Sequence, residues 1–240
     1  MRIGLFSDCE GNAVALESVL TALRAHAPDL LVCAGDLLCC PFSPDPPAET
    51  VALLKAHGVL AIPGNHDRYL MDWGTPRWPH TLWMRLRRLD PVGVWIDHMA
   101  ACQAQIRPAD LAWLRALPEE RVLDEGRVYV CHGMPGNPWN SIWPRHPIYD
   151  GNVSDADREA ALHVLAHAAG AAGRPAEMVL CGHTSEPREY RDRLPAGGEI
   201  RVIRGCHARG QVGFALLTRA GTTWDVQWGA GEARPRDRPS

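Results

Sequence analysis

Short apolar runs alternate with segments of helical periodicity over the first quarter of the chain. The apolar runs fall at residues 2–7, 30–34 and 59–62, and polar residues follow each of them. Between the runs, residues 12–26 carry leucines and valines at helical spacing, and a second helical segment covers 48–57. The pattern predicts strands joined by helices. Crossovers of this kind produce a largely parallel sheet.

The middle of the chain has a different pattern. From residue 68 to about 120 it is rich in Trp, Arg and Pro. Helical spacing near residues 80–89, 94–104 and 109–117 predicts a helical insert over 68–120. The Trp and Arg residues between Trp73 and Arg88 have two interpretations: a lid that stacks on a base and attracts phosphate, or a cap packed on the sheet.

The second half returns to strand signals. Apolar runs at residues 127–131 and 178–181 predict two buried strands. Between them, residues 155–169 have an amphipathic pattern, and Ser154 is a candidate N-cap for that helix. Residues 188–228 combine β-branched runs with glycine-rich turns and predict a set of mostly antiparallel strands.

Composition limits the class of protein. The chain has 240 residues, of which 46% are hydrophobic and 22% charged, so we expect one globular domain over 1–228 and a flexible tail at 229–240. The formal charge of -3 provides no general attraction for nucleic acid or an anionic membrane. No apolar run approaches the ~20 residues that cross a bilayer, and Asp8 comes too early for a secretory signal. We therefore expect a cytoplasmic protein without stable nucleic-acid or membrane binding.

The eight cysteines form no C-x-x-C pair and no spacing typical of a zinc ribbon or a disulfide framework. We interpret them as small buried side chains.

Five polar clusters carry the candidate chemistry, and each follows an apolar run. Since parallel strands present their carboxyl ends at one edge of a sheet, we expect these clusters to converge. Carboxylates suit hard cations and imidazoles suit transition metals, so the mixture favours Mn²⁺, with Fe, Zn²⁺ or Mg²⁺ possible. A carboxylate can bridge two ions ~3.5–4 Å apart, an arrangement that supports in-line displacement at phosphorus. The clusters are SDCEGN at 7–12, GD at 35–36, GNHD at 64–67, CHG at 131–133 and CGHT at 181–184.

The order of these clusters resembles the calcineurin-like metallophosphoesterase family, whose pattern is D-x-H, G-D, G-N-H-[DE], a lone His after a strand, then G-H-x-H. The resemblance runs from residue 2 to about 217, and HGMP at 132–135 is similar to the family's small bacterial phosphodiesterases. It implies an α/β (α+β) fold, a four-layer αββα sandwich of two mixed sheets flanked by helices, with two divalent metal ions.

The resemblance also implies roles for individual residues. Asp8 and Glu10 would bind the first metal, and Asp36 would bridge both. His66, paired with Asp67, would face the scissile phosphate without binding metal, and in the leading hypothesis it helps to protonate the leaving oxygen. The implied ligands of the second metal are Asn65, His132 and His183, and the substrate-binding candidates are Asn12 and His207.

Two positions depart from the family pattern, and both concern the first metal. Glu10 stands where the family has His, and Ser185 replaces the second His of G-H-x-H. Glu10 either supplies an oxygen ligand, which favours Mn²⁺ or Mg²⁺ over Zn²⁺ at this site, or is a solvated charge without a metal. His207 lies in the turn RGCHARG at 204–210. It either supplies the missing imidazole ligand of the first metal or contacts phosphate together with Arg204 or Arg209.

The leading hypothesis is a dinuclear-metal phosphoesterase that hydrolyses a phosphodiester or nucleotide-type small molecule through a metal-bridging hydroxide. The alternative is a family member whose first metal site has decayed and which serves as a binding or scaffold module. A protein phosphatase is disfavoured, because no acidic residue follows Asp36 closely.

Overall fold

Two mixed β-sheets form the centre of the computed structural model, which describes residues 1–38, 46–86, 92–143, 153–168, 175–183, 188–195, 197–208 and 211–231. The first sheet has the order β11-β10-β1-β2-β3, with β9 beside β10. Its strands are β1 (Arg2–Phe6), β2 (Leu30–Cys33), β3 (Leu60–Ala61), β9 (Cys206–Ala208), β10 (Gln211–Ala220) and β11 (Thr223–Ala230).

The second sheet has the order β4-β5-β6-β8-β7. In each sheet three neighbouring strands are parallel, β1-β2-β3 in the first and β5-β6-β8 in the second, and the remaining pairs are antiparallel. The strands of the second sheet are β4 (Arg121–Leu123), β5 (Val128–Val130), β6 (Met178–Cys181), β7 (Arg188–Arg193) and β8 (Glu199–Arg204).

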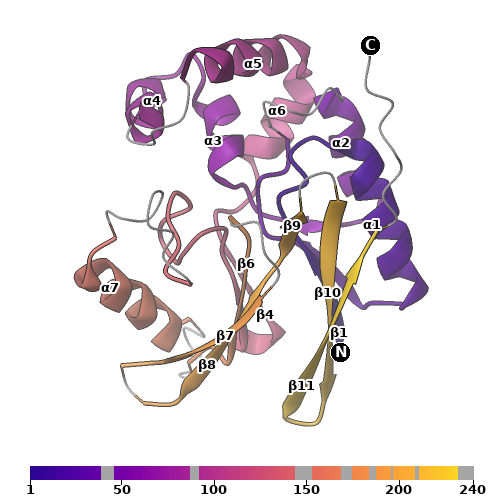
Figure 1. Ribbon diagram of the computed structural model, residues 1–240, viewed down its shortest axis with the longest axis vertical. Helices are drawn as coiled ribbons and strands as arrows, with labels where there is room; N and C mark the ends of the chain where they lie inside the picture. Colours follow the sequence, from indigo (N-terminus) through magenta and orange to yellow (C-terminus); the bar gives the residue numbers. More distant parts are fainter. Residues whose placement is uncertain are drawn as a thin grey trace.

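Helices cover the outer faces of both sheets (Figure 1). Helices α1 (Ala13–Ala25) and α2 (Pro47–Ala56) pack on the first sheet, and α7 (Asp155–Ala166) packs on the second. This arrangement confirms the four-layer αββα sandwich. The remaining helices gather at the end of the sandwich shown at the top of Figure 1: α3 (Asn65–Asp72), α4 (Trp78–Leu86), α5 (Val92–Gln105) and α6 (Pro108–Arg115).

The alternation of side chains along each strand determines these layers. Ile3 and Leu5 of β1 point toward the second sheet, whereas Phe6 belongs to the cluster beneath α1. Gly4 also faces α1, where a Cβ atom would lie 2.9 Å from Leu23 Cδ2. The same alternation holds in the second sheet, where even-numbered residues of β5 and β6 fill the core between the sheets and odd-numbered ones pack toward α7. Both faces are apolar because both are covered.

The strand predictions at residues 2–7, 30–34, 127–131 and 178–181 are confirmed to within about one residue at each end. The sequence pattern did not predict two elements, β4 and α3. Helix α3 begins at Asn65, within a cluster that reads as a turn, and Asp67 closes its first turn by accepting a hydrogen bond from the Gly64 backbone N–H at 2.8 Å.

The helices of the insert share a hydrophobic core with α1 and α2. Leu70 of α3 and Leu114 of α6 belong to the same cluster as Leu16 of α1. Trp73 and Trp78 pack against this cluster with ring centroids 4.5 Å apart, while Trp83 stays half exposed. The cap interpretation therefore holds for Trp73 and Trp78, and Arg87 and Arg88 lie outside the described residues.

The single-domain boundary at residue 228 stays a prediction.

Strand β11 continues two residues past the predicted start of the tail at 229, and the flexible tail itself stays a prediction. Gly229 and Ala230 pair with Phe214 and Gly213 at the end of β11, and residues 232–240 lie outside the described residues. Among the helices that the structure describes, none combines the length and the apolar character needed to cross a membrane.

We expect the cap of α7 to contribute measurably to stability. The Ser154 Oγ accepts a hydrogen bond from the Asp157 backbone N–H, and Asp157 reciprocates. Replacement Ser154→Ala should lower the free energy of unfolding in urea by about 1 kcal/mol, whereas Ser154→Asp should preserve it because Asp also caps helices. Equal loss in both variants would contradict this role of the cap.

Candidate metal centre

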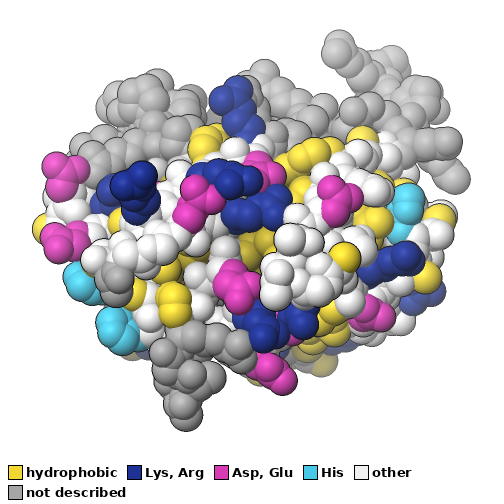
Figure 2. Space-filling model, turned by 90° about the horizontal axis from the view of Figure 1, so that it is seen from below, with side chains coloured by type: hydrophobic (Ala, Val, Ile, Leu, Met, Phe, Trp, Pro, Cys, Tyr) yellow, Lys and Arg dark blue, Asp and Glu magenta, His cyan; other side chains and the backbone are white. Residues whose placement is uncertain are grey.

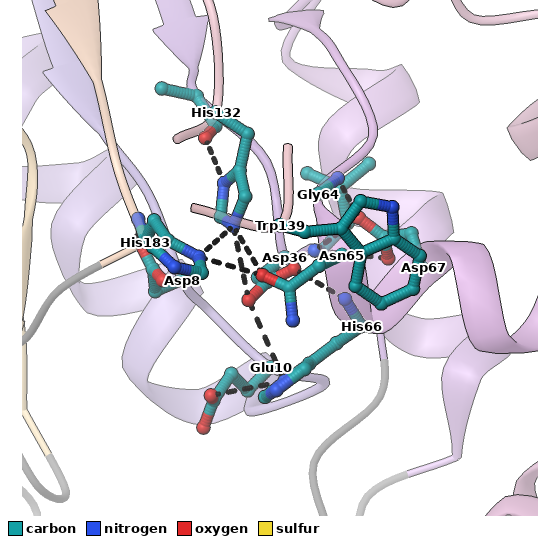
Figure 3. A network of polar contacts seen from close by, with 12 residues as sticks. Asp8, Glu10, Asp36, Gly64, Asn65, His66, Asp67, His132, Trp139 and His183 are labelled. Carbon is teal, nitrogen blue, oxygen red and sulfur yellow. Dashed lines mark hydrogen bonds and ion pairs between the residues drawn. The ribbon is translucent and has the colours of Figure 1, made fainter. Parts of the chain in front are cut away.

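The polar clusters that follow the parallel strands meet at one edge of the two sheets (Figure 3). Asp8 follows β1, Asp36 follows β2, and Asn65 begins α3 after β3. His132 and His183 follow β5 and β6 of the other sheet. Four of these side chains are buried, and Asp36 is only 3% exposed. Burial of several ionisable groups at one point requires charge compensation there.

The backbone is strained at this edge. The described chain has seven non-glycine residues with positive φ, and four of them are Asp8, Glu10, Asp36 and His183. This conformation costs on the order of 1 kcal/mol per residue and persists only where the surroundings enforce it. Here the loops after β1 and β2 are joined by backbone hydrogen bonds of 2.9 Å, from Asp8 N–H to Gly35 O and from Glu10 N–H to Asp36 O.

The first cluster of ligand atoms centres on His132 and corresponds to the second metal of the sequence prediction. Its Nδ1 lies 2.7 Å from the carbonyl oxygen of Ala34, which can only accept, so Nδ1 carries the proton. The other nitrogen, Nε2, lies 3.0 Å from Asn65 Oδ1 and 3.3 Å from Asp36 Oδ2. His183 Nδ1 completes the group at 2.8 Å from the same Asn65 oxygen.

This cluster fits a metal cation. In the neutral tautomer of His132, the lone pair of Nε2 faces the lone pairs of Asn65 Oδ1, and the two repel unless a positive charge lies between them. Burial lowers the pKa of His132, but the carboxylates of Asp36 and Asp8 outweigh it and raise this pKa to about 9. The site therefore favours a cation, and two imidazoles with two oxygens suit a transition metal.

A second cluster, which corresponds to the predicted first metal, lies beside the first cluster and shares Asp36 with it. His66 Nδ1 lies 3.3 Å from Glu10 Oε1 and 3.6 Å from Asp36 Oδ2. The His66 backbone N–H also donates to Asp36 Oδ1 at 2.8 Å. Asp36 Oδ2 therefore lies within 3.6 Å of imidazole nitrogens from both clusters, and these imidazoles lower the pKa of Asp36 against the effect of burial. This is the position that a bridging carboxylate requires.

Asp67 has a different role from the predicted pairing with His66. Its carboxylate accepts hydrogen bonds from the backbone N–H groups of Leu37, Leu38 and Gly64 at 2.8–3.1 Å. Asp67 therefore joins the loops that carry Asp36 and Asn65. The His66 ring instead faces Glu10 and Asp36 and stacks on buried Tyr69, with centroids 6.0 Å apart.

The sequence pattern did not identify Tyr69 as a neighbour of the site. It lies three residues after His66, so the contact would follow from a helix that begins at Asn65. Trp139, from the loop after β5, contacts the Tyr69 ring edge-on at 5.3 Å.

The remaining candidates lie around the site or outside the described residues. Asn12 caps α1, and its Oδ1 accepts from the Ala15 backbone N–H at 3.0 Å. Arg204 is buried, donates to the carbonyl of Trp143, and lies over the Tyr190 ring, so it anchors a loop, and its predicted contact with phosphate stays a prediction. His207 belongs to β9, but its side chain lies outside the described residues, as do Ser185 and Arg209.

The buried cysteines surround the site as filler. Cys9 and Cys33 have sulfur atoms 3.8 Å apart, and burial raises the pKa of the Cys33 thiol well above its ordinary value. Cys131 and Cys181 are buried in the layer beneath α7. All four are free thiols, which agrees with the interpretation of small buried side chains.

The fold and the paired ligand clusters define a metal-dependent enzyme that hydrolyses phosphoester bonds. Residues 1–187 match the family model of the calcineurin-like phosphoesterases, and the chain belongs to that family. A search of curated proteins finds no match.

Solved structures agree with this fold. The crystal structure of a metallophosphoesterase from Sphaerobacter thermophilus is 21% identical, with 98% of this chain and 90% of that chain covered and a TM-score of 0.63. The crystal structure of a putative diadenosine tetraphosphatase is 19% identical, with coverage of 95% and 93% and a TM-score of 0.51.

Substitution Asp67→Ala should destabilise the chain at pH 4, where the buried carboxyl of Asp67, whose pKa burial raises to about 6, carries no costly charge. Alanine accepts no hydrogen bond, so the backbone N–H groups of Leu37, Leu38 and Gly64 lose their acceptor. We expect the free energy of unfolding to fall by roughly 1–3 kcal/mol. The exposed Asp225→Ala is the matched control and should change it by less than about 0.5 kcal/mol. Equal stability of the two variants in urea would contradict the loop-joining role.

The metal-free chain should gain stability at neutral pH from Asp8→Asn. Burial raises the pKa of Asp8 to about 6, above the ~4 of an unfolded chain. The folded state therefore binds the proton more tightly and loses stability as pH rises from about 4 to 6. In chelator at pH 7, urea unfolding should show a gain of about 1–3 kcal/mol for the variant, shrinking toward zero near pH 4. A variant less stable than the parent at pH 7 would refute this.

Proposed function

We propose that this enzyme hydrolyses a phosphodiester or nucleotide-type phosphoester of a small molecule, with two divalent cations. The observation that carries the proposal is the position of Asp36 Oδ2, which lies 3.3 Å from His132 Nε2 and 3.6 Å from His66 Nδ1. A carboxylate oxygen common to two clusters of ligand atoms is suited to a pair of ions and has no evident use in a site for one.

The two ions would have different ligands. Asp8 and Glu10 would hold the first ion, Asp36 would contact both, and the second would be held by Asn65, His132 and His183. When bound, the ions supply a nucleophile from water at neutral pH and positive charge for the phosphoryl oxygens in the transition state. Glu10 in place of an imidazole makes the first position richer in oxygen, which favours Mn²⁺ or Mg²⁺ over Zn²⁺ there.

The protein contributes orientation and hydrogen bonds. The proton on His132 Nδ1 is held by the Ala34 carbonyl, so Nε2 keeps its lone pair toward the centre of the site. The His66 side chain is 20% exposed although Nδ1 is buried, so the exposed part is elsewhere on the ring. We assign that part to the substrate, where an N–H donates to the leaving oxygen.

The substrate class is argued from surroundings of the site. Tyr69 is fully buried and stacks on His66 from the interior, whereas Trp139, which contacts Tyr69 edge-on, is only partly buried. The exposed part of the Trp139 indole suits a nucleobase or another planar group on the phosphoester. The solved structure of a putative diadenosine tetraphosphatase, which is similar in fold, adds support for a nucleotide-type substrate.

The scaffold alternative would require the first position to have lost its ligands. The carboxylate of Glu10, 16% exposed, is directed at His66 and is not a solvated surface charge. We therefore favour the enzyme with both positions, and the count of bound Mn²⁺ separates the two: about two ions per chain for the enzyme, one or none for the scaffold.

Activity should depend on Asp36. Hydrolysis of a chromogenic diester and a chromogenic monoester is measured with Mn²⁺, for the parent chain and for Asp36→Asn. The neutral amide binds a second cation poorly, so we expect turnover to fall roughly 10²–10³-fold, a loss comparable to removal of one electrostatic contact in the transition state. Asp225→Asn, on the distant β11, should keep full activity. Undiminished turnover in Asp36→Asn would refute the two-ion site, and the ratio of the two rates assigns diester or monoester preference.

A further inference from the structure

The second cluster, formed by Glu10, Asp36 and His66, contains an imidazole, although Glu10 stands where the family pattern has a His. Glu10, Asp36 and His66 each offer one ligand atom, and these atoms lie within 4.8 Å of one another. Figure 3 shows the carboxylate of Glu10, from the loop after β1, and the ring of His66, from the first turn of α3, directed toward each other. Their nearest atoms, Glu10 Oε1 and His66 Nδ1, are 3.3 Å apart.

The backbone holds each of these three residues in place. The His66 N–H donates to Asp36 Oδ1, so the other oxygen, Oδ2, stays directed toward the His66 ring. Glu10 has a left-handed conformation, φ 48°, enforced by its N–H bond to the carbonyl of Asp36. Tyr69 packs against the His66 ring from the protein interior. The cluster is therefore preorganised, as ligands of a metal are when packing and hydrogen bonds fix their orientation.

We propose that His66 binds the first cation through Nδ1, together with Glu10 and Asp36. With Asp8, which is assigned to the same ion above, the donor set has three carboxylates and one imidazole and suits Mn²⁺ or Fe²⁺. The inference rests on the two-cation site proposed above and changes the role of His66 within it. The opposite nitrogen, Nε2, keeps its proton and donates a hydrogen bond to the phosphoester. An imidazole bound at Nδ1 does not release that proton readily, so His66 orients the leaving oxygen without protonating it.

The chain thereby compensates for its two departures at the first position. Glu10 and Ser185 stand at places where an imidazole was expected from the family pattern, and neither can supply nitrogen. His66 supplies one from the first turn of α3. A simple ion pair between His66 and Glu10 is the competing explanation. It would hold the same two side chains together but would compete with a cation for Glu10.

Counting Mn²⁺ distinguishes ligand from ion pair without measuring activity. The chain is equilibrated with a fixed free concentration of Mn²⁺, and bound metal is measured by elemental analysis. Pulsed electron paramagnetic resonance then reports nitrogen nuclei coupled to Mn²⁺. We expect two ions for the parent chain and one for His66→Ala, with affinity at the lost position reduced roughly 100-fold and one nitrogen coupling missing.

A second variant tests the assignment by rescue. In the His66→Ala background, Glu10→His returns an imidazole to the same cluster, and we expect the first ion, lost in the single variant, to bind again. The exposed His163→Ala, on α7 and distant from the site, is the matched control and should keep two ions. Circular dichroism of the metal-free variants confirms that each one is folded.

Each result decides between the hypotheses. If His66→Ala retains two ions of parental affinity and loses only turnover, His66 contacts the substrate alone and this inference is wrong while the proposed function stands. If His66→Ala binds the first ion more tightly, the ion pair is correct. If the parent chain binds fewer than two ions at millimolar Mn²⁺, the inference and the proposed function both fail.

Discussion

The position of one buried carboxylate, Asp36, determines how the rest of the site is arranged. Its two oxygens have separate partners: Oδ1 accepts from the His66 backbone, and Oδ2 faces imidazoles from two clusters. This crowding is possible because Gly64 lies against the carboxylate, where any Cβ atom would collide with it. The Asp67 carboxylate accepts from backbone N–H groups of the loop after β2 and of the loop after β3, and these hydrogen bonds hold the two loops at a constant separation.

The same features that create the site reduce the stability of the chain without its cations. Burial raises the pKa values of Asp8 and Asp67, so their ionised forms are costly in the folded chain, and several ligands occupy left-handed backbone conformations. Such costs are tolerated where binding compensates for them, since a ligand that binds only the folded state adds its binding free energy to stability. The two apolar layers around the parallel strands supply the rigid support, because both faces of each sheet are covered.

The sequence predicted most of the fold because the periodicity of apolar residues is local. β1, α1 and β2 follow directly from it. The start of α3 does not, because Gly64 and Asn65 are typical of turns, and only the hydrogen bond from the Gly64 N–H to Asp67 shows that a helix begins there. Asn12 is the N-cap of α1, with its Oδ1 accepting from the Ala15 backbone, and its predicted contact with the substrate stays a prediction.

The sequence alone determined the donor chemistry of the site and the edge at which it lies, since each cluster follows a strand and parallel strands end together. Which atoms share a point was decided by the tertiary structure. Glu10 and His66 are far apart along the chain, and their 3.3 Å separation depends on strand register, on left-handed loop residues and on the hydrogen bonds that join the loops. The pattern of residue types does not predict the register, the loop conformations or these hydrogen bonds, because each depends on the relative positions of distant segments.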